Sequence, residues 1–184
     1  MGLGDLVSPA PRLNRSRRSR PEDYAALSGR VPSPTPSVVH TTALALLKGG
    51  AQVLSNAVSN AYVAPGAEVA WDECCAGHLY VRTVTVTPVF GQTAADGNHC
   101  SIRYWLATLA LGTLRCVEVV DDRGRGPRPY DLTADAAVLH QDMADLGMFL
   151  TSQTNASDME WSAQGPEGGC VSGEWTFSVK VNCP

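Results

Sequence analysis

The residues best suited to chemistry in this chain are its cysteines and two of its histidines. The cysteines are Cys74, Cys75, Cys100, Cys116, Cys170 and Cys183, with His78 and His99 nearby in the sequence. Zinc prefers such ligands, but its sites commonly draw on C-x₂₋₄-C pairs, and no Cys-x-x-Cys occurs. In an extended segment, Cys74 and Cys75 would point to opposite sides. We therefore expect no metal site. We expect free, largely buried thiols rather than disulfides, unless the chain enters an oxidising medium.

Catalysis by a nucleophile and a base lacks a supporting pattern. A cysteine could pair with His78, His99 or His140, but nothing in the sequence supplies a third, orienting group. His140 sits beside the apolar stripe of an expected helix, which favours a surface position. The neighbouring acids Asp72-Glu73 and Asp121-Asp122 fall in expected loops, where solvated charge is common. We predict that the protein is not an enzyme, with no catalytic residues and no cofactor.

A glycine-rich stretch, GPEGGCVSG at residues 165–173, raises the question of a phosphate-binding loop. Such loops work because the amides and dipole of a following helix point at the anion. Here the glycines precede an alternating strand, and Glu167 adds the wrong charge. The stretch therefore predicts a permissive turn that aims a strand.

Three stretches read as strands because β-branched and apolar residues alternate with polar ones: 77–90, 100–119 and the segment that follows the glycine-rich turn. In the first, Thr83, Thr85 and Thr87 should face one way and Val84 and Val86 the other. In the second, Ile102, Tyr104 and Leu106 should face one way and Trp105, Ala107, Leu109 and Leu111 the other. In the last, Trp175, Phe177, Val179 and Val181 should point inward, and Glu174, Thr176, Ser178 and Lys180 outward. The second strand is apolar on both faces, so both need covering.

Apolar residues at helical spacing predict helices over residues 40–62 and 131–150. The first stripe is Leu44, Leu47, Ala51, Leu54, Val58 and Ala61. The second is Leu132, Ala136, Leu139, Met143, Leu146 and Leu150. Asp135, Asp142 and Asp145 should lie off the second stripe. The expected caps are Thr41 or Thr42 for the first helix and Asp131 or Thr133 for the second.

The order of elements indicates an α+β domain over residues 39–184, with a small, mostly antiparallel sheet of about four strands flanked by two helices. Residues 1–38 form an Arg- and Pro-rich arm that should be extended, because proline fixes φ and lacks an N–H. The first 30 residues hold six arginines against three acids, and the remainder holds eight basic against fifteen acidic residues. The acidic body should repel nucleic-acid phosphates, so only the arm could touch them. No apolar run is long enough to predict a membrane partner.

Three stretches resemble a known family: AWDECCAGHLYVRTVTVTPV, YWLATLALGTLRCVEVVDDRG and, most specifically, GPEGGCVSGEWTFSV. They are similar to the tail terminators, or tail-completion proteins, in the neck of long-tailed actinobacterial phages. The similarity spans about residues 40–182, and Ser172 replaces an expected glycine. It implies a small α+β subunit of a hexameric ring that caps the tail tube in the virion. It brings no catalytic residues.

The resemblance also implies partners: further copies of the chain, the major tail tube protein and the head-side stopper or connector. Genomic DNA would pass through the ring without specific binding. The expected subunit interface is the hairpin of residues 77–90 and 100–118 together with the arm. Its candidate residues are Trp105, Tyr104, Leu109, Arg103, Arg17 and Arg18. Large aromatics dominate interface energetics, although Trp105 could instead fill the core.

Two other functions remain open from the sequence. One is a neighbouring neck component, the stopper or adaptor. The other is a secreted binding domain held together by disulfides or a metal.

Overall fold

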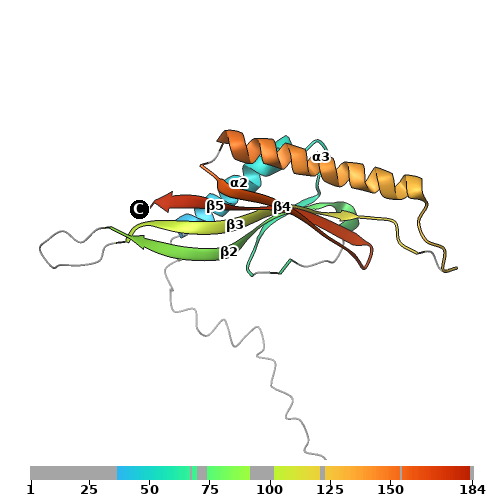
Figure 1. Cartoon of the computed structure of the whole chain (residues 1–184), viewed down its shortest axis with the longest axis horizontal. Coiled ribbons are helices and arrows are strands. Elements are labelled where there is room, and N and C mark those ends of the chain that lie inside the picture. Colours follow the sequence, from blue (N-terminus) through green and yellow to red (C-terminus); the bar gives the residue numbers. More distant parts are fainter. Residues whose placement is uncertain are drawn as a thin grey trace, which may run out of the picture. The chain divides into compact units, whose positions relative to one another are not determined.

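In the part of the chain that the structure describes, five strands form one sheet in the order β1-β2-β3-β5-β4, and two helices lie on one of its faces (Figure 1). The computed structural model describes residues 37–66, 68–69, 74–91, 102–120, 123–153 and 155–182. The helices are α2 (Val38–Val53) and α3 (Pro129–Gln153), and a short 3-10 helix, η1, spans Cys74–Ala76. The strands are β1 (Asn60–Ala64), β2 (His78–Phe90), β3 (Ile102–Cys116), β4 (Ser157–Glu167) and β5 (Cys170–Asn182). The predicted arm, apart from its last two residues, lies outside the described residues.

The α+β class is confirmed, with five strands where about four were predicted. Only β1 pairs in parallel, with the first residues of β2, and the other three pairs are antiparallel. The fifth strand arises because the first helix ends at Val53 rather than at residue 62, which makes residues 60–64 available for β1. Beyond the helix, the Ser55 N–H donates to Asp145 Oδ2 at 2.7 Å. The Ser55 N–H, which a longer helix would have bonded to one of its own carbonyls, is thus bonded to a carboxylate of α3.

The start and the buried face of α2 also differ from prediction. Ser37 is the N-cap, and its hydroxyl accepts the His40 N–H at 3.1 Å. The predicted caps Thr41 and Thr42 instead lie inside the helix and donate back to carbonyls one turn earlier. The buried residues of α2 are Ala43, Leu46, Leu47 and Gly50, so the apolar face is rotated from the predicted stripe.

Glycine has a packing role in α2. A side chain at Gly49 would collide with the ring of Phe149 from α3. At Gly50 it would reach Leu146 and Leu111 at 3.4–3.5 Å. The absence of side chains here lets α2 lie close to α3 and the sheet, which offsets the poor helix propensity of glycine.

The second helix is confirmed and slightly longer than predicted, beginning at Pro129 and ending at Gln153. Leu139, Leu146 and Leu150 of the predicted stripe are buried, whereas Leu132 is exposed. Asp142 and Asp145, which were predicted to lie off the stripe, are both buried nevertheless. Each carboxylate has hydrogen-bond donors from elsewhere in the chain, which makes its burial tolerable.

The main core lies between the helices and the sheet. β3 contributes Ala107, Leu109 and Leu111, and β5 contributes Phe177, Val179 and Val181. The predicted alternation of β5 is confirmed apart from Glu174, which is buried on the opposite face of the sheet.

The predicted threonine face of β2 was wrong because of a bulge. Thr83 pairs with Leu109 and so lies on the helix-covered face, but after a register shift Thr85 pairs with Thr108 on the opposite face. One extra residue in a strand inverts the alternation beyond it.

The glycine-rich turn joins β4 to β5, as the sequence predicted. Gly168 and Gly169 form the turn with positive φ values of 57° and 82°, which favour glycine. Among the described helices, none is long and apolar enough to cross a bilayer.

Candidate functional site

The outer half of β2 forms an open edge of the sheet. β1 pairs only with residues 78–82 of β2, so from Thr83 to Phe90 the strand has β3 as its one neighbour among the described residues. The backbone groups on the other side of such a strand are available to pair with another chain. Figure 1 shows this part of β2 at the margin of the sheet.

The side chains of this open edge suit association. The segment TVTVTPVF, residues 83–90, carries no charged residue. Val84, Val86 and Phe90 are 40%, 38% and 53% exposed. Pro88 cannot donate a backbone hydrogen bond, but a single proline is tolerated in an edge strand. We name residues 83–90 the β2 edge.

The opposite edge, β4, is protected in the usual ways. It carries Asp158, Glu160 and Glu167, and its pairing with β5 is interrupted by two register shifts. Asp158 also has a positive φ of 53°. Acidic side chains and irregular backbone discourage edge-to-edge pairing. The two edges therefore differ in charge: the β2 edge carries no charged residue, whereas β4 carries three acids. Both edges have register shifts, which on the β2 edge lie between Thr83 and Thr85 and between Val89 and Phe90.

The predicted interface residues on β3 fall in different environments. Arg103 is exposed. Tyr104 is half-buried on the face away from the helices, where the Lys180 ammonium lies 4.6 Å from the centroid of the Tyr104 ring. Trp105 is half-buried on the helix side and packs against the main core, and Leu109 is fully buried. Arg103 and Tyr104 are therefore accessible to a partner, whereas Leu109 is not in this structure. Arg17 and Arg18 lie outside the described residues.

A buried polar cluster lies on the face of the sheet away from the helices. Arg82 Nε donates to Glu174 Oε2 at 3.0 Å and its Nη2 to Oε1, while the Tyr80 hydroxyl donates to Oε2 at 3.1 Å. Burial and the Glu174 charge raise the pKa of Tyr80, and the hydrogen bond to Glu174 raises the pKa of Arg82. Tyr80 therefore stays protonated and Arg82 stays charged near neutral pH.

This cluster lines a hollow of about 420 Å³, together with Glu68, Glu167 and Gln164. The Glu174 carboxylate is occupied by its two donors, so the arrangement suits a structural network rather than proton transfer. The sequence analysis missed it by placing Glu174 on an exposed polar face. The available signal was Arg82, an isolated charge within a strand that is otherwise uncharged.

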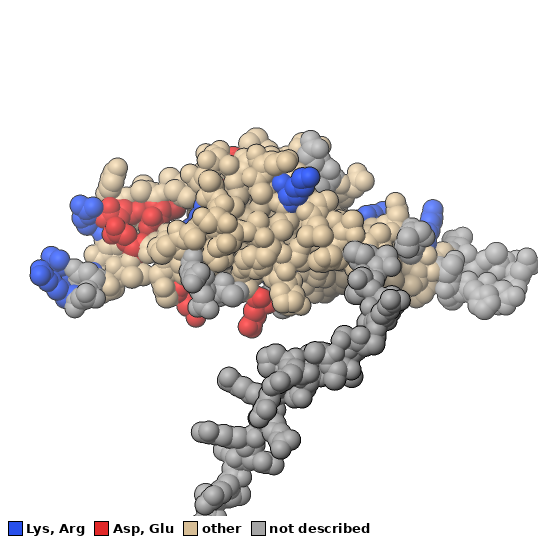
Figure 2. Space-filling model, turned by 180° about the vertical axis from the view of Figure 1, so that it is seen from behind, with Lys and Arg blue, Asp and Glu red and all other residues tan. Residues whose placement is uncertain are grey.

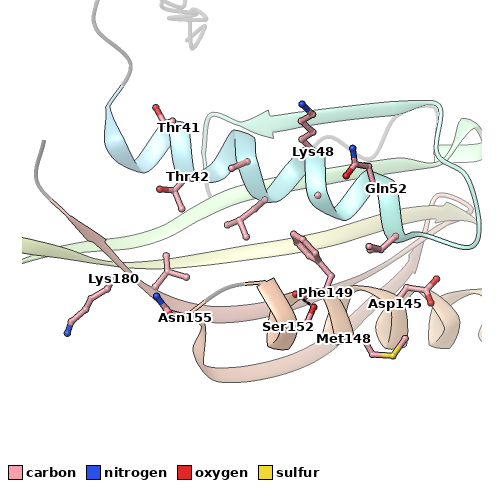
Figure 3. A pocket seen from close by; sticks show the side chains of 15 residues that line it. Thr41, Thr42, Lys48, Gln52, Asp145, Met148, Phe149, Ser152, Asn155 and Lys180 are labelled. Carbon is pink, nitrogen blue, oxygen red and sulfur yellow. Dashed lines mark hydrogen bonds between the residues drawn. The ribbon is translucent and has the colours of Figure 1, made fainter.

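A larger groove of about 1060 Å³ runs between α2 and α3 (Figure 3). Phe149 points across it toward α2, and Lys48 points away from it. Its lining is mainly apolar, including Leu46 and Met148, with Asp145 as its acid. Hydrogen bonds from the Ser55 N–H and Gln141 outweigh the effect of burial and lower the pKa of Asp145. The groove therefore offers apolar contact rather than a catalytic constellation.

Four cysteines form two disulfides at one end of the sheet, Cys74–Cys170 and Cys75–Cys116. The prediction of free thiols was wrong for these four. It assumed that residues 74 and 75 were extended, whereas the turn of η1 brings both near β3 and β5. Cys100 and Cys183 lie outside the described residues.

We found no protein-family model and no curated protein that matches this chain.

Proposed function

We propose that this protein is a structural subunit that associates with copies of itself into a closed ring, as the tail terminator of a long-tailed phage. The ring would cap the tail tube and join it to the head-side connector. The observation that carries the proposal is the asymmetry of the sheet in charge and pairing: the β2 edge is uncharged and has no strand on its outer side among the described residues, whereas β4 at the other edge carries three acids. A head-to-tail ring needs two different surfaces on each subunit, and an open edge facing an unlike surface satisfies that need.

The distribution of charge supports protein contacts over nucleic-acid binding. Most of the face shown in Figure 2 is formed by uncharged residues, and its largest acidic cluster lies near one end. Basic stripes that could follow a phosphate backbone are not visible on the described part of this face. In the proposed ring, DNA passes without being held, because a body rich in acids repels it.

The β2 edge is the proposed contact, with Tyr104 and Arg103 beside it on β3. Its exposed valines would be buried against the next subunit, and its backbone groups would gain hydrogen bonds. Trp105 supports the hairpin from the core side, in agreement with the alternative that the sequence left open.

The first experiment measures the oligomeric state of the full chain by light scattering and electron microscopy. Val86→Lys places a charge on the β2 edge and should convert rings to monomers without changing the circular dichroism. The control is Leu132→Lys on α3, which is 48% exposed and far from the edge in the sequence, and it should leave rings intact. A wild-type chain that stays monomeric at high concentration, or rings that survive Val86→Lys, would contradict the proposed contact.

Electron microscopy of phage particles tests the finer assignment. Label on this chain should form one ring at the upper end of the tail tube. Label nearer the portal would identify a stopper or adaptor instead, and absence from particles would exclude a neck role.

The two disulfides favour one second candidate, a secreted binding domain stabilised by disulfides. Thiol titration of protein taken directly from the producing cells separates the candidates. Oxidised cysteines there favour the secreted domain, and reduced cysteines favour assembly in the cytoplasm.

A further inference from the structure

The four bonded cysteines come from three elements that meet at one point. Cys74 and Cys75 are consecutive in η1. Cys116 and Cys170 are direct partners in the β3–β5 register, so their side chains leave the same face of the sheet. The sulfur atoms of Cys74, Cys75 and Cys116 all lie within 4.8 Å of one another, and the fourth sulfur is bonded to that of Cys74.

This arrangement is close to the one that zinc requires. Four thiolates around Zn²⁺ lie at about 2.3 Å from the metal in a tetrahedron, which places the sulfurs about 3.8 Å apart. The bonded pairs would have to open to that distance. The Cys170 sulfur is not among the three that lie within 4.8 Å of one another, so it is farther than that from the sulfur of Cys75 or Cys116 and would have to approach by more than about 1 Å. Rotation about the Cα–Cβ bonds of neighbouring cysteines covers movements of this size.

We propose that the reduced chain binds one Zn²⁺ through Cys74, Cys75, Cys116 and Cys170, and that the two disulfides are the oxidised form of the same site. This replaces the expectation from sequence that the chain has no metal site. It is independent of the proposed function.

The chemistry balances with a thiol reductant. Two dithiol molecules each give two electrons and two protons to one protein disulfide and become disulfides themselves, which leaves four cysteine thiols. Zn²⁺ then displaces four protons and forms four Zn–S bonds, so the site carries a net charge of −2. Cys75 and Cys116 are exposed, which gives the metal a path to the site, while Cys74 and Cys170 are buried.

Either form fastens the segment between β1 and β2 to the ends of β3 and β5. The buried side of the site packs in a small second core formed by Cys74, Leu114 and Cys170. Reduction without metal removes both links, so we expect the reduced apo chain to be the least stable of the three forms.

The test uses the full chain, reduced with a phosphine and kept free of oxygen. Titration with Co²⁺ should give a stoichiometry of one, with the d–d bands of a tetrahedral site and thiolate-to-cobalt charge transfer. Zn²⁺ should displace the cobalt. Cys116→Ser and Cys170→Ser should lose or greatly weaken these bands, and the matched controls Cys100→Ser and Cys183→Ser should retain them.

A second measurement holds even if a variant fails to fold. In the wild-type chain, Zn²⁺ should protect four of the six thiols from an aromatic disulfide reagent and leave two reactive. Absence of tetrahedral cobalt bands, equal reactivity of all six thiols with zinc present, or loss of binding in Cys100→Ser would overturn the proposal.

Discussion

Replacing Asp142 with alanine should destabilise this fold severely, because it removes the counter-charge of a buried arginine. Arg115 Nε donates to Asp142 Oδ2 at 2.8 Å, and its Nη2 donates to Oδ1 at 2.9 Å. The Asp142 side chain is 0% exposed and that of Arg115 is 11% exposed. Arg115 also donates to the carbonyls of Asn56 and Ala57 at 2.7 and 2.9 Å, so it ties β3 to α3 and to the segment after α2.

The size of the effect follows from burial. Removing one partner of a buried, bidentate ion pair leaves an uncompensated charge and typically costs about 3–5 kcal/mol. For a chain of this length, each kcal/mol lowers Tm by roughly 2–4 °C, so we expect a fall of roughly 6–20 °C in Asp142→Ala. Asp142→Asn keeps the shape and one acceptor but not the charge, and should fall between the alanine variant and wild type.

Urea and thermal unfolding followed by circular dichroism provide the assay. The control is Asp131→Ala, which breaks the Arg128–Asp131 pair at the surface, where the Arg128 side chain is 80% exposed. Although the Asp131 side chain is 13% exposed, solvent screens the exposed Arg128 charge, so the variant should lose far less stability than Asp142→Ala. If Asp142→Ala lost no more stability than Asp131→Ala, the reasoning from burial would be refuted.

Three further predictions concern the backbone, pH and the arm. Gly112→Ala should destabilise the fold by about 1–3 kcal/mol, because the new Cβ would lie 2.6 Å from the carbonyl oxygen of Gly173. The control is Gly126→Ala, whose Cβ would have no atom within 4 Å and which should be nearly neutral in the same unfolding assay. The pKa of the Asp145 carboxyl is lowered from 3.8 in the folded state, so its contribution to stability is complete above pH 3.8 and is lost as the pH falls through the folded pKa. The difference in unfolding free energy between wild type and Asp145→Asn should therefore shrink on acidification. A difference that stays constant with pH would contradict this. Deleting residues 1–36 keeps the Ser37 cap and should leave monomer stability unchanged while weakening ring assembly, as measured by light scattering; rings of unchanged stability would exclude a role for the arm.

The features that could be predicted from sequence are those fixed by local periodicity. The inward and outward alternation of β5, the helix before it and the glycine turn all follow from residues within one element. The stripe of α3 was partly right for the same reason, since Leu139 and Leu146 are buried.

The errors arose where partners come from distant parts of the chain. The residues near Asp142 in the sequence do not indicate that it pairs with Arg115, which lies 27 residues away. Arg82 and Glu174 are 92 residues apart. The cysteine cluster likewise depends on a one-turn helix and on a strand register that no local pattern fixes. The hairpin of residues 77–90 and 100–118 was predicted as a subunit interface, but the open β2 edge was not, because its exposure depends on where β1 ends.

The arrangement of the sheet links these observations to the proposed role. The helices cover one face, and the acid–arginine pairs and the disulfide-bonded cysteines lie toward the end of the sheet where β2 begins and β3 ends. The β2 edge itself is held by its antiparallel pairing with β3, which pairs in turn with β5, so the edge is part of the sheet rather than a free loop. An edge held in this way loses little conformational entropy on pairing, which favours association among identical subunits. A flexible edge with the same sequence would pair less selectively and would favour aggregation over a closed ring.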